Sequence, residues 1–344
     1  MGKTVLLNRI ESLAETAGYR TIIIESPEDQ RLAQLLVPRL RTALLKLSSY
    51  EAAKDTARQG LRVLRAFAAA FKIGLGEIEI GVDPESGTAD SGNLELDLPE
   101  MLIALAKAAS AAGTGVAVLI DEVQYIQKPD LSALIVAMHR VSQKALPLVM
   151  FGAGLPQIAA LAGEAKSYSE RLFDFPDVGP LDDAASREAI TAPLVREHVS
   201  IDEDALRMIM EKTLGYPYFL QEWGSHAWNV AQTSPITLRD VQNAGIATIN
   251  RLDRGFFRVR LDRLTPREKD YVRAMASLGR GPHRSGEIAR VLNIDVKTAG
   301  PLRNGLIKKG MIYSPQHGDT AFTVPMFDEF MIRSMPNWSA GSNA

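Results

Sequence analysis

The sequence predicts an α/β fold with a parallel sheet, then a wholly helical region, then a winged helix-turn-helix unit. Short apolar runs at residues 21–25, 116–120 and 147–151 alternate with helical stretches of ten residues or more. This alternation is typical of β-α-β units and a parallel sheet. Residues 182–249 carry only helical patterns, and residues 264–334 show the order helix, helix-turn-helix, strand pair, helix.

Local signals place the elements of the first half. Residues 4–17 carry Leu6, Ile10 and Leu13 at helical spacing, and Gly18 ends the run. The apolar runs are β-branched and short, as buried strands are. Further elements are expected as helices over residues 28–72, 98–112 and 131–144, a small hairpin from Gly74, and a fourth strand over 172–178.

The composition is that of an ordinary globular protein. Of 344 residues, 46% are hydrophobic and 23% are charged, which argues against disorder and coiled coil. No apolar run reaches the roughly 18 residues of a membrane-spanning helix, and the N-terminus does not resemble a secretory signal. The sequence has no cysteine and only five histidines, which excludes thiolate chemistry and argues against a metal held by protein ligands alone. We therefore expect a cytoplasmic protein without a membrane partner.

Charge is distributed unevenly along the chain. Residues 264–334 contain 11 Lys and Arg against 7 Asp and Glu, a net charge of +4. The whole chain has a formal net charge of −2, so the remainder carries −6. A basic C-terminal unit is typical of a nucleic-acid reader, although ordinary solvated surface charge explains +4 equally well.

The first residues match the end of a phosphate-binding loop. Gly2-Lys3-Thr4 leads directly into a predicted helix, as in the pattern G-x-x-x-x-G-K-[ST]. In such a loop the backbone amides and the helix N-terminus hold phosphates, the lysine reaches the terminal oxygens, and the hydroxyl binds Mg²⁺. Three common residues match by chance often, so this signal is weak alone.

A second motif strengthens the first. The predicted buried strand 116–120 ends in Asp121-Glu122, at the strand end where open α/β sheets bind ligands. Asp121 is expected to hold Mg²⁺ through water, and Glu122 to orient and deprotonate the attacking water. The alternative for an acidic pair here is a turn or a helix cap. Together the two motifs predict an ATPase.

These motifs resemble those of the AAA+ ATPases, most closely the branch of origin-recognition-type initiators and STAND signalling ATPases. Gly2-Lys3-Thr4 resembles the end of Walker A, and Val118 to Glu122 resembles Walker B. Gly215-Tyr216-Pro217 is similar to the G-x-P signature with which this branch contacts the adenine side of the nucleotide. The resemblance implies ATP and Mg²⁺ as cofactors and a homo-oligomer that meets across the ATP site.

Two further positions follow from the resemblance. Arg171 stands where the family often has its trans-acting arginine finger; the alternative is a surface arginine. The family also has a polar residue near the end of the strand after Walker B, where it senses the γ-phosphate. This sequence reads Phe151-Gly-Ala-Gly154 there, so sensing would use a backbone group or be lost.

The resemblance also implies a domain plan. We expect a nucleotide-binding core over residues 1–181, a helical lid over 182–262, the winged helix over 263–335 and a disordered tail over 336–344. A phosphate loop needs an upstream strand and a first glycine, and the printed sequence has only Met1 before Gly2. We therefore expect an N-terminal truncation within Walker A, a sheet without its first strand, and weak ATP binding or none by the chain as given.

The C-terminal unit has clear boundaries. Thr265, Pro266 and Glu268 form a helix start with a capping box, and a turn at residues 293–295 separates the next two helices. In a winged helix the helix after the turn enters the major groove of double-stranded DNA. The expected contacts are Lys297, Thr298 and Arg303 to bases, and Lys308, Lys309 and His317 to phosphates.

Two functions remain open from the sequence. The first is an ATP-dependent switch protein associated with DNA. The alternative is a non-catalytic regulatory protein whose winged helix docks to a protein partner.

Overall fold

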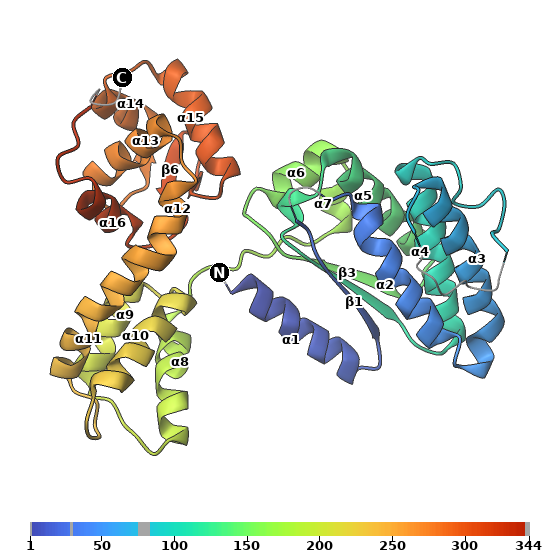
Figure 1. Cartoon of the computed structure of the whole chain (residues 1–344), viewed down its shortest axis with the longest axis horizontal. Coiled ribbons are helices and arrows are strands. Elements are labelled where there is room, and N and C mark those ends of the chain that lie inside the picture. The colour runs from blue at the N-terminus through green and yellow to red at the C-terminus, as the bar shows by residue number, and fades with distance from the viewer. Residues whose placement is uncertain (1, 28–29, 75–82, 341–344) are drawn as a thin grey trace. The chain divides into compact units, whose positions relative to one another are not determined.

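The computed structural model describes residues 2–27, 30–74 and 83–340. The hairpin expected from Gly74 falls on residues 75–82, outside the described residues. Contacts divide the chain into two compact units, Gly2–Val178 and Gly179–Ala344 (Figure 1). This division lies three residues before the predicted boundary at 181.

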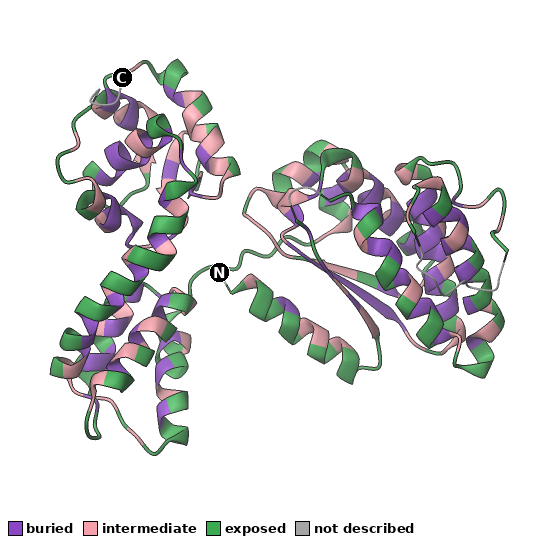
Figure 2. Ribbon diagram, in the orientation of Figure 1, coloured by how far each residue is buried: buried purple, intermediate pink, exposed green. Residues whose placement is uncertain are grey.

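The first unit is built on a parallel sheet of the order β1-β2-β3. Its strands are β1 (Arg20–Glu25), β2 (Val116–Asp121) and β3 (Leu148–Gly152), close to the three predicted runs. The register pairs Glu25 with Asp121, so the carboxyl ends of β1 and β2 meet at one edge. All six residues of β2 are buried, as expected for a central strand (Figure 2).

Alternation along β2 divides the unit into two cores. Val118 and Ile120 face a large core, whereas Ala117 and Leu119 face a small core on the other side of the sheet. Helix α1 (Lys3–Thr16) covers the small core through Leu7, as predicted for residues 4–17. Most of the large core comes from α2 (Leu32–Leu47), α3 (Lys54–Ala70), α4 (Leu94–Ala111) and α5 (Lys128–Gln143).

One predicted strand is wrong. Helices α6 (Ile158–Ala165) and α7 (Ser169–Leu172) follow β3, and no strand forms over residues 172–178. This segment contains Pro176, which has no amide hydrogen to donate to a sheet, and Asp174 and Asp177 are exposed. Its apolar residues therefore do not enter a sheet.

The second unit begins with a helical part, as predicted. Its elements are α8 (Asp183–Arg196), α9 (Glu203–Thr213), α10 (Pro217–Val230), α11 (Leu238–Arg251), a π-helical turn (Leu252–Phe257) and α12 (Arg258–Asp262). The C-terminal part contains α13 (Pro266–Ser277), β4 (His283–Arg284), α14 (Ser285–Leu292), α15 (Val296–Lys308), β5 (Ile312–Tyr313), β6 (Asp319–Phe322) and α16 (Phe327–Ser334). The predicted helix starts and the turn before α15 are confirmed, and β4, β6 and β5 form a small antiparallel sheet.

One hydrophobic core runs through the whole second unit. It joins Trp223 and Phe257 of the helical part to Tyr271 and Phe330 of the C-terminal part. The predicted boundary at 262/263 thus lies inside a continuous core.

The disorder predicted for residues 336–344 does not hold for Trp338. Its indole donates to Asp270 Oδ1 at 2.8 Å, and the guanidinium of Arg273 lies 5.3 Å from the centroid of its ring. An aromatic side chain in an otherwise polar tail therefore anchors the segment to α13. None of the helices among the described residues is long and apolar enough to cross a membrane.

Candidate functional site

The structure brings two of the predicted site residues together. Thr4 lies in the first turn of α1, and its hydroxyl donates to Asp121 Oδ2 at 2.5 Å, across 117 positions of sequence. Asp121 ends β2 and is 8% exposed. Gly2 caps α1 in a left-handed conformation, and Lys3 begins the helix beside Thr4. The first turn of α1 therefore lies at the carboxyl edge of the sheet.

Glu122 is held in an uncommon backbone conformation. Its φ of 54° is left-handed, which costs a non-glycine residue about 1–2 kcal/mol. The Glu122 amide donates to Asp121 Oδ1 at 2.9 Å, which fixes this turn directly after the strand. The side chain stays partly exposed, so its carboxylate is accessible at the same edge.

Two residues at this edge escaped the sequence analysis. The Gln124 side-chain amide donates to Glu122 Oε2 and accepts from the Leu155 backbone at 3.1 Å. Ser26, which follows β1, is 2% exposed, and its hydroxyl has no hydrogen-bond partner among the described residues. Gly154 lies beside Gln124, since a Cβ there would lie 2.2 Å from Ile158 Cδ1 and 2.5 Å from Gln124 Oε1, but this contact becomes visible only in the structure.

The donor set suits a hydrated magnesium ion and a phosphate. A threonine hydroxyl and a carboxylate in contact are oxygen ligands of the kind that Mg²⁺ takes. The unpartnered hydroxyl of Ser26 lies at the same sheet edge, since its amide donates to the Asp121 carbonyl at 3.2 Å. Among the described residues no cluster of three or more His, Cys, Asp or Glu could hold a metal by itself.

Arg171 lies on the short helix α7 of the same unit. Its side chain is exposed and makes no ion pair within the described part of the chain.

Gly215-Tyr216-Pro217 belongs to the second unit, where it connects α9 to α10. Gly215 has a φ of +69°, its carbonyl accepts from the Leu181 amide at 2.9 Å, and any Cβ would overlap the Leu181 carbonyl. Pro217 is the first residue of α10. The motif thereby fixes the start of the second unit.

The Tyr216 side chain is used in packing. The centroid of its ring lies 4.6 Å from that of Phe219 and 6.2 Å from that of Phe256. The guanidinium carbon of Arg260 lies 3.7 Å from the centroid of the Phe256 ring. Burial raises the pKa of the Tyr216 hydroxyl and lowers that of Arg260.

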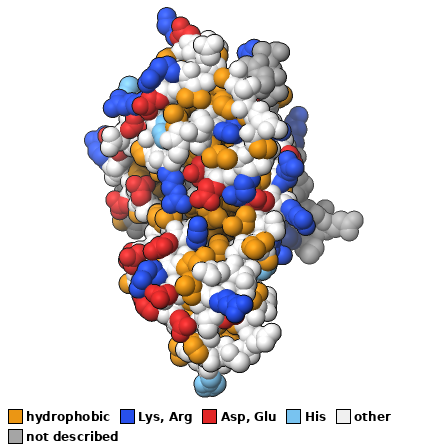
Figure 3. All heavy atoms as spheres, turned by 90° about the vertical axis from the view of Figure 1, so that its left-hand side faces the viewer, with side chains coloured by type: hydrophobic (Ala, Val, Ile, Leu, Met, Phe, Trp, Pro, Cys, Tyr) orange, Lys and Arg blue, Asp and Glu red, His pale blue; other side chains and the backbone are white. Residues whose placement is uncertain are grey.

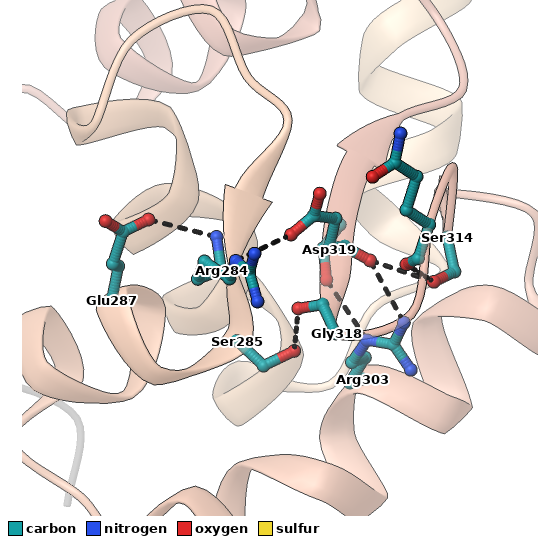
Figure 4. A network of polar contacts seen from close by, with 9 residues as sticks. Arg284, Ser285, Glu287, Arg303, Ser314, Gly318 and Asp319 are labelled. Atoms are coloured by element: carbon teal, nitrogen blue, oxygen red, sulfur yellow. Dashed lines mark hydrogen bonds and ion pairs between the residues drawn. The ribbon is translucent and has the colours of Figure 1, made fainter.

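Two of the six predicted DNA contacts have structural partners. Arg303 donates through Nε to Thr320 Oγ1 at 3.0 Å and through a terminal nitrogen to the Asp319 carbonyl at 3.1 Å, so it holds α15 to the β5–β6 hairpin (Figure 4). Arg284 forms an ion pair with Asp319 from the other side of this network.

Lys309 is used in the same way. Its ammonium donates to Glu268 Oε2 at 2.6 Å and to the Arg263 carbonyl at 3.0 Å, which joins the end of α15 to the capping box of α13. Burial acts to raise the pKa of Glu268, and hydrogen bonds from Lys309 and Thr265 outweigh it, so the pKa lies below its usual value. The sequence analysis predicted Arg303 and Lys309 as DNA contacts. It missed their partners within the protein, because these partners are distant in sequence.

The other four predicted contacts are exposed. Lys297, Thr298 and Lys308 lie on α15, and His317 lies between β5 and β6. Asn304, which the sequence analysis missed, is exposed on α15 between the two lysines. At 100° per residue, positions 297, 304 and 308 share one face of the helix. Acidic and basic side chains are interspersed on the face of the molecule seen in Figure 3.

Comparisons with known proteins agree with this architecture. Residues 254–331 match a family described as a domain of unknown function (DUF8462). No curated protein sequence matches the chain. The Walker-type ATPase of Pyrococcus abyssi superposes with a TM-score of 0.57 at 18% identity, over 92% of this chain and 85% of that one.

Two other solved structures are more distant. The Orc1 protein of Aeropyrum pernix, solved in complex with DNA, gives a TM-score of 0.41 at 14% identity, over 97% of this chain and 84% of that one. The RuvB Holliday junction branch migration motor of Thermotoga maritima gives 0.36 at 15%, over 65% and 80%. The likeness to the Pyrococcus protein shows that this chain shares its fold, which here contains the parallel sheet.

Proposed function

We propose that the protein is an ATP-binding and ATP-hydrolysing switch of the initiator-like AAA+ branch, acting in the cytoplasm. The bond between Thr4 and Asp121 carries this proposal, because it joins the end of the phosphate-loop motif to the acid after the central strand. Thr4 and Asp121 would hold Mg²⁺, Lys3 would contact the terminal phosphate oxygens, and Glu122 would deprotonate the attacking water. ATP hydrolysis would be slow, because in a switch protein it serves to change the conformation of the protein.

Further contacts belong to the same proposal. Gly215, Tyr216 and Pro217 would contact the adenine side of the nucleotide, and Arg171 would reach the nucleotide of a neighbouring copy in a homo-oligomer. The exposure of Arg171 supports the second role. Because Tyr216 is packed against Phe219 and Phe256, the adenine contact falls to the backbone of this motif.

Magnesium dependence tests the nucleotide site. Calorimetric titration of the 344-residue chain with ATP should show weak binding, because Gly2 to Thr4 supply only part of a phosphate loop. Mg²⁺ should tighten that binding, and Asp121→Asn should remove the magnesium effect while the exposed control Asp174→Asn retains it. Wild-type affinity that is independent of Mg²⁺ would contradict the proposed site, and a low-micromolar dissociation constant would contradict the impairment.

The C-terminal part is proposed to be a winged helix-turn-helix that binds double-stranded DNA. The order of its elements and the exposed face of α15 support this assignment. Lys297 and Lys308 lie eleven residues apart on that face, about 16 Å along the helix axis, with Asn304 between them. Asparagine can pair with adenine in the major groove, Lys297 is proposed as a base contact, and Lys308 suits a phosphate.

The two adjacent lysines at the end of α15 provide a matched test. Lys308→Met should lower DNA affinity and reduce the slope of log affinity against log salt by about 0.9, the value of one phosphate contact. Lys309→Met should leave that slope unchanged and lower the free energy of unfolding by about 1–2 kcal/mol, because Glu268 loses its charged partner. Binding that does not respond to salt would contradict DNA recognition.

A second candidate function is a docking module without catalysis. Arg303 and Lys309 have partners inside the unit, and residues 264–334 carry a net charge of only +4. A winged helix with so little free positive charge could bind a protein instead of DNA.

A further inference from the structure

The edge of the sheet lacks a polar side chain where an ATPase would read the terminal phosphate. Strand β3 and the loop after it consist of Phe151, Gly152, Ala153 and Gly154 at this point. Backbone bonds hold this loop against β2, since the Ala153 amide donates to the Ile120 carbonyl at 2.8 Å and the Val123 amide donates to the Ala153 carbonyl at 3.0 Å. These bonds hold the loop after β3 against the loop after β2. Strand β3 itself supplies no polar side chain at this edge of the sheet.

Gln124 fills this place from the neighbouring loop. Its side-chain nitrogen donates to Glu122 Oε2, and its side-chain oxygen accepts from the Leu155 amide at 3.1 Å. The side chain thus connects the carboxylate after β2 to the backbone after β3.

Gly154 leaves room beside the Gln124 amide. A Cβ on residue 154 would lie 2.2 Å from Ile158 Cδ1 and 2.5 Å from Gln124 Oε1, so a larger residue would displace one of these side chains. A primary amide has two N–H donors, and the one to Glu122 is the only bond given by Gln124 Nε2 among the described residues. The side chain is partly exposed, so its second N–H can reach a ligand at this edge.

We propose that Gln124 positions Glu122 and reads the terminal phosphate of ATP, in place of the polar residue that β3 lacks. One amide proton orients the Glu122 carboxylate, and the second is donated to a γ-phosphate oxygen. The Leu155 amide holds the side chain in the orientation that permits both. This inference rests on the proposed ATPase function for its ligand, and on the Glu122–Gln124–Leu155 contacts for its geometry.

Two substitutions distinguish the role of the amide's donor, Nε2, from that of its acceptor, Oε1. Gln124→Met keeps the length of the side chain and removes both its donors and its acceptor. Gln124→Glu keeps an acceptor for Leu155 and replaces the donor with a negative charge beside Glu122. Gln34 is exposed on α2 with no side-chain hydrogen bond within the described residues, so Gln34→Met and Gln34→Glu are the matched controls.

Amide hydrogen exchange of Leu155 in the 344-residue chain tests the geometry without nucleotide. Gln124→Met should accelerate this exchange about fivefold to tenfold, the effect of losing one neutral hydrogen bond. Gln124→Glu and both Gln34 variants should leave it at the wild-type rate. Unchanged protection in Gln124→Met would overturn the inference, whatever the protein does with ATP.

The ratio of ATP to ADP affinity tests the reading of the phosphate. Competition measurements by ligand-observed NMR, which record weak binding, should show that both Gln124 variants lose about tenfold of the preference for ATP over ADP. ADP affinity should stay unchanged, because the bond is made only to the γ-phosphate. A purely structural role would leave the ratio unaltered, and that result would overturn the reading of the phosphate.

Failure of the proposed ATPase function would give a different result from failure of the Gln124 inference. If the wild-type chain binds neither nucleotide, the ATPase proposal fails for this chain. The exchange of Leu155 then decides the positioning role of Gln124 by itself.

Discussion

Replacing Glu122 by glutamine should lower ATP turnover by about 10²–10⁴-fold, the contribution of a positioned general base, in a form of the protein with a complete phosphate loop. Glutamine has the same size and can still accept the hydrogen bond from Gln124, so the edge of the sheet keeps its geometry. It cannot take a proton from water at neutral pH. Nucleotide affinity should therefore remain within about twofold of wild type, since the substitution leaves the phosphate and magnesium ligands in place.

Two quantities are measured for each variant: the steady-state rate of phosphate release and the nucleotide affinity. Glu211→Gln, on the exposed side of α9 in the second unit, is the control that changes the same charge elsewhere. Turnover that persists in Glu122→Gln would show that Glu122 is not the base. If the wild-type protein shows no turnover and the substitution changes no other activity, the non-catalytic alternative is correct.

Gly215→Ala should lower the free energy of unfolding of the second unit by about 2–4 kcal/mol. Two costs add at this position. The backbone has a φ of +69°, which side chains disfavour, and the new methyl group would overlap the Leu181 carbonyl. The Leu181 amide would also lose its acceptor, the Gly215 carbonyl, if the chain moves apart.

Gly279→Ala separates the cost of backbone strain from the cost of steric overlap. Gly279 has a φ of +88°, and a methyl group added there would meet no atom within 4 Å, so its substitution carries only the backbone strain of about 1–2 kcal/mol. Chemical denaturation of both variants, followed by the fluorescence of the buried Trp223, measures the difference. Equal destabilisation at the two positions would mean that the contact with Leu181 is not tight.

Much of the architecture could be predicted because its signals are local. The apolar run before Asp121 identified β2, and the Thr265-Pro266-Glu268 start identified α13. Asp121 and Glu122 were singled out because they stand where the apolar run ends, at the carboxyl end of the predicted strand. The predicted strand over 172–178 was wrong, because an apolar pattern does not reveal whether a sheet edge will accept it.

The roles of several polar residues could not be predicted. Gln124 finds Leu155 31 positions away, and Lys309 finds Glu268 41 positions away. Arg303 looked like a base contact because helical spacing placed it near the presented face, yet the hairpin offers it two acceptors. Trp338 resembled part of a polar tail until α13 offered Asp270.

The sequence alone determined the three strands of the parallel sheet, the main helices, and which acids stand at the end of the central strand, since hydrophobic periodicity and capping act over a few residues. Only the tertiary structure decided which charged and amide side chains remain free for a ligand. Folding brings distant hydrogen-bond partners into contact, and a polar group that enters the interior takes whichever partner is nearest, because leaving it unpaired costs about 1–3 kcal/mol.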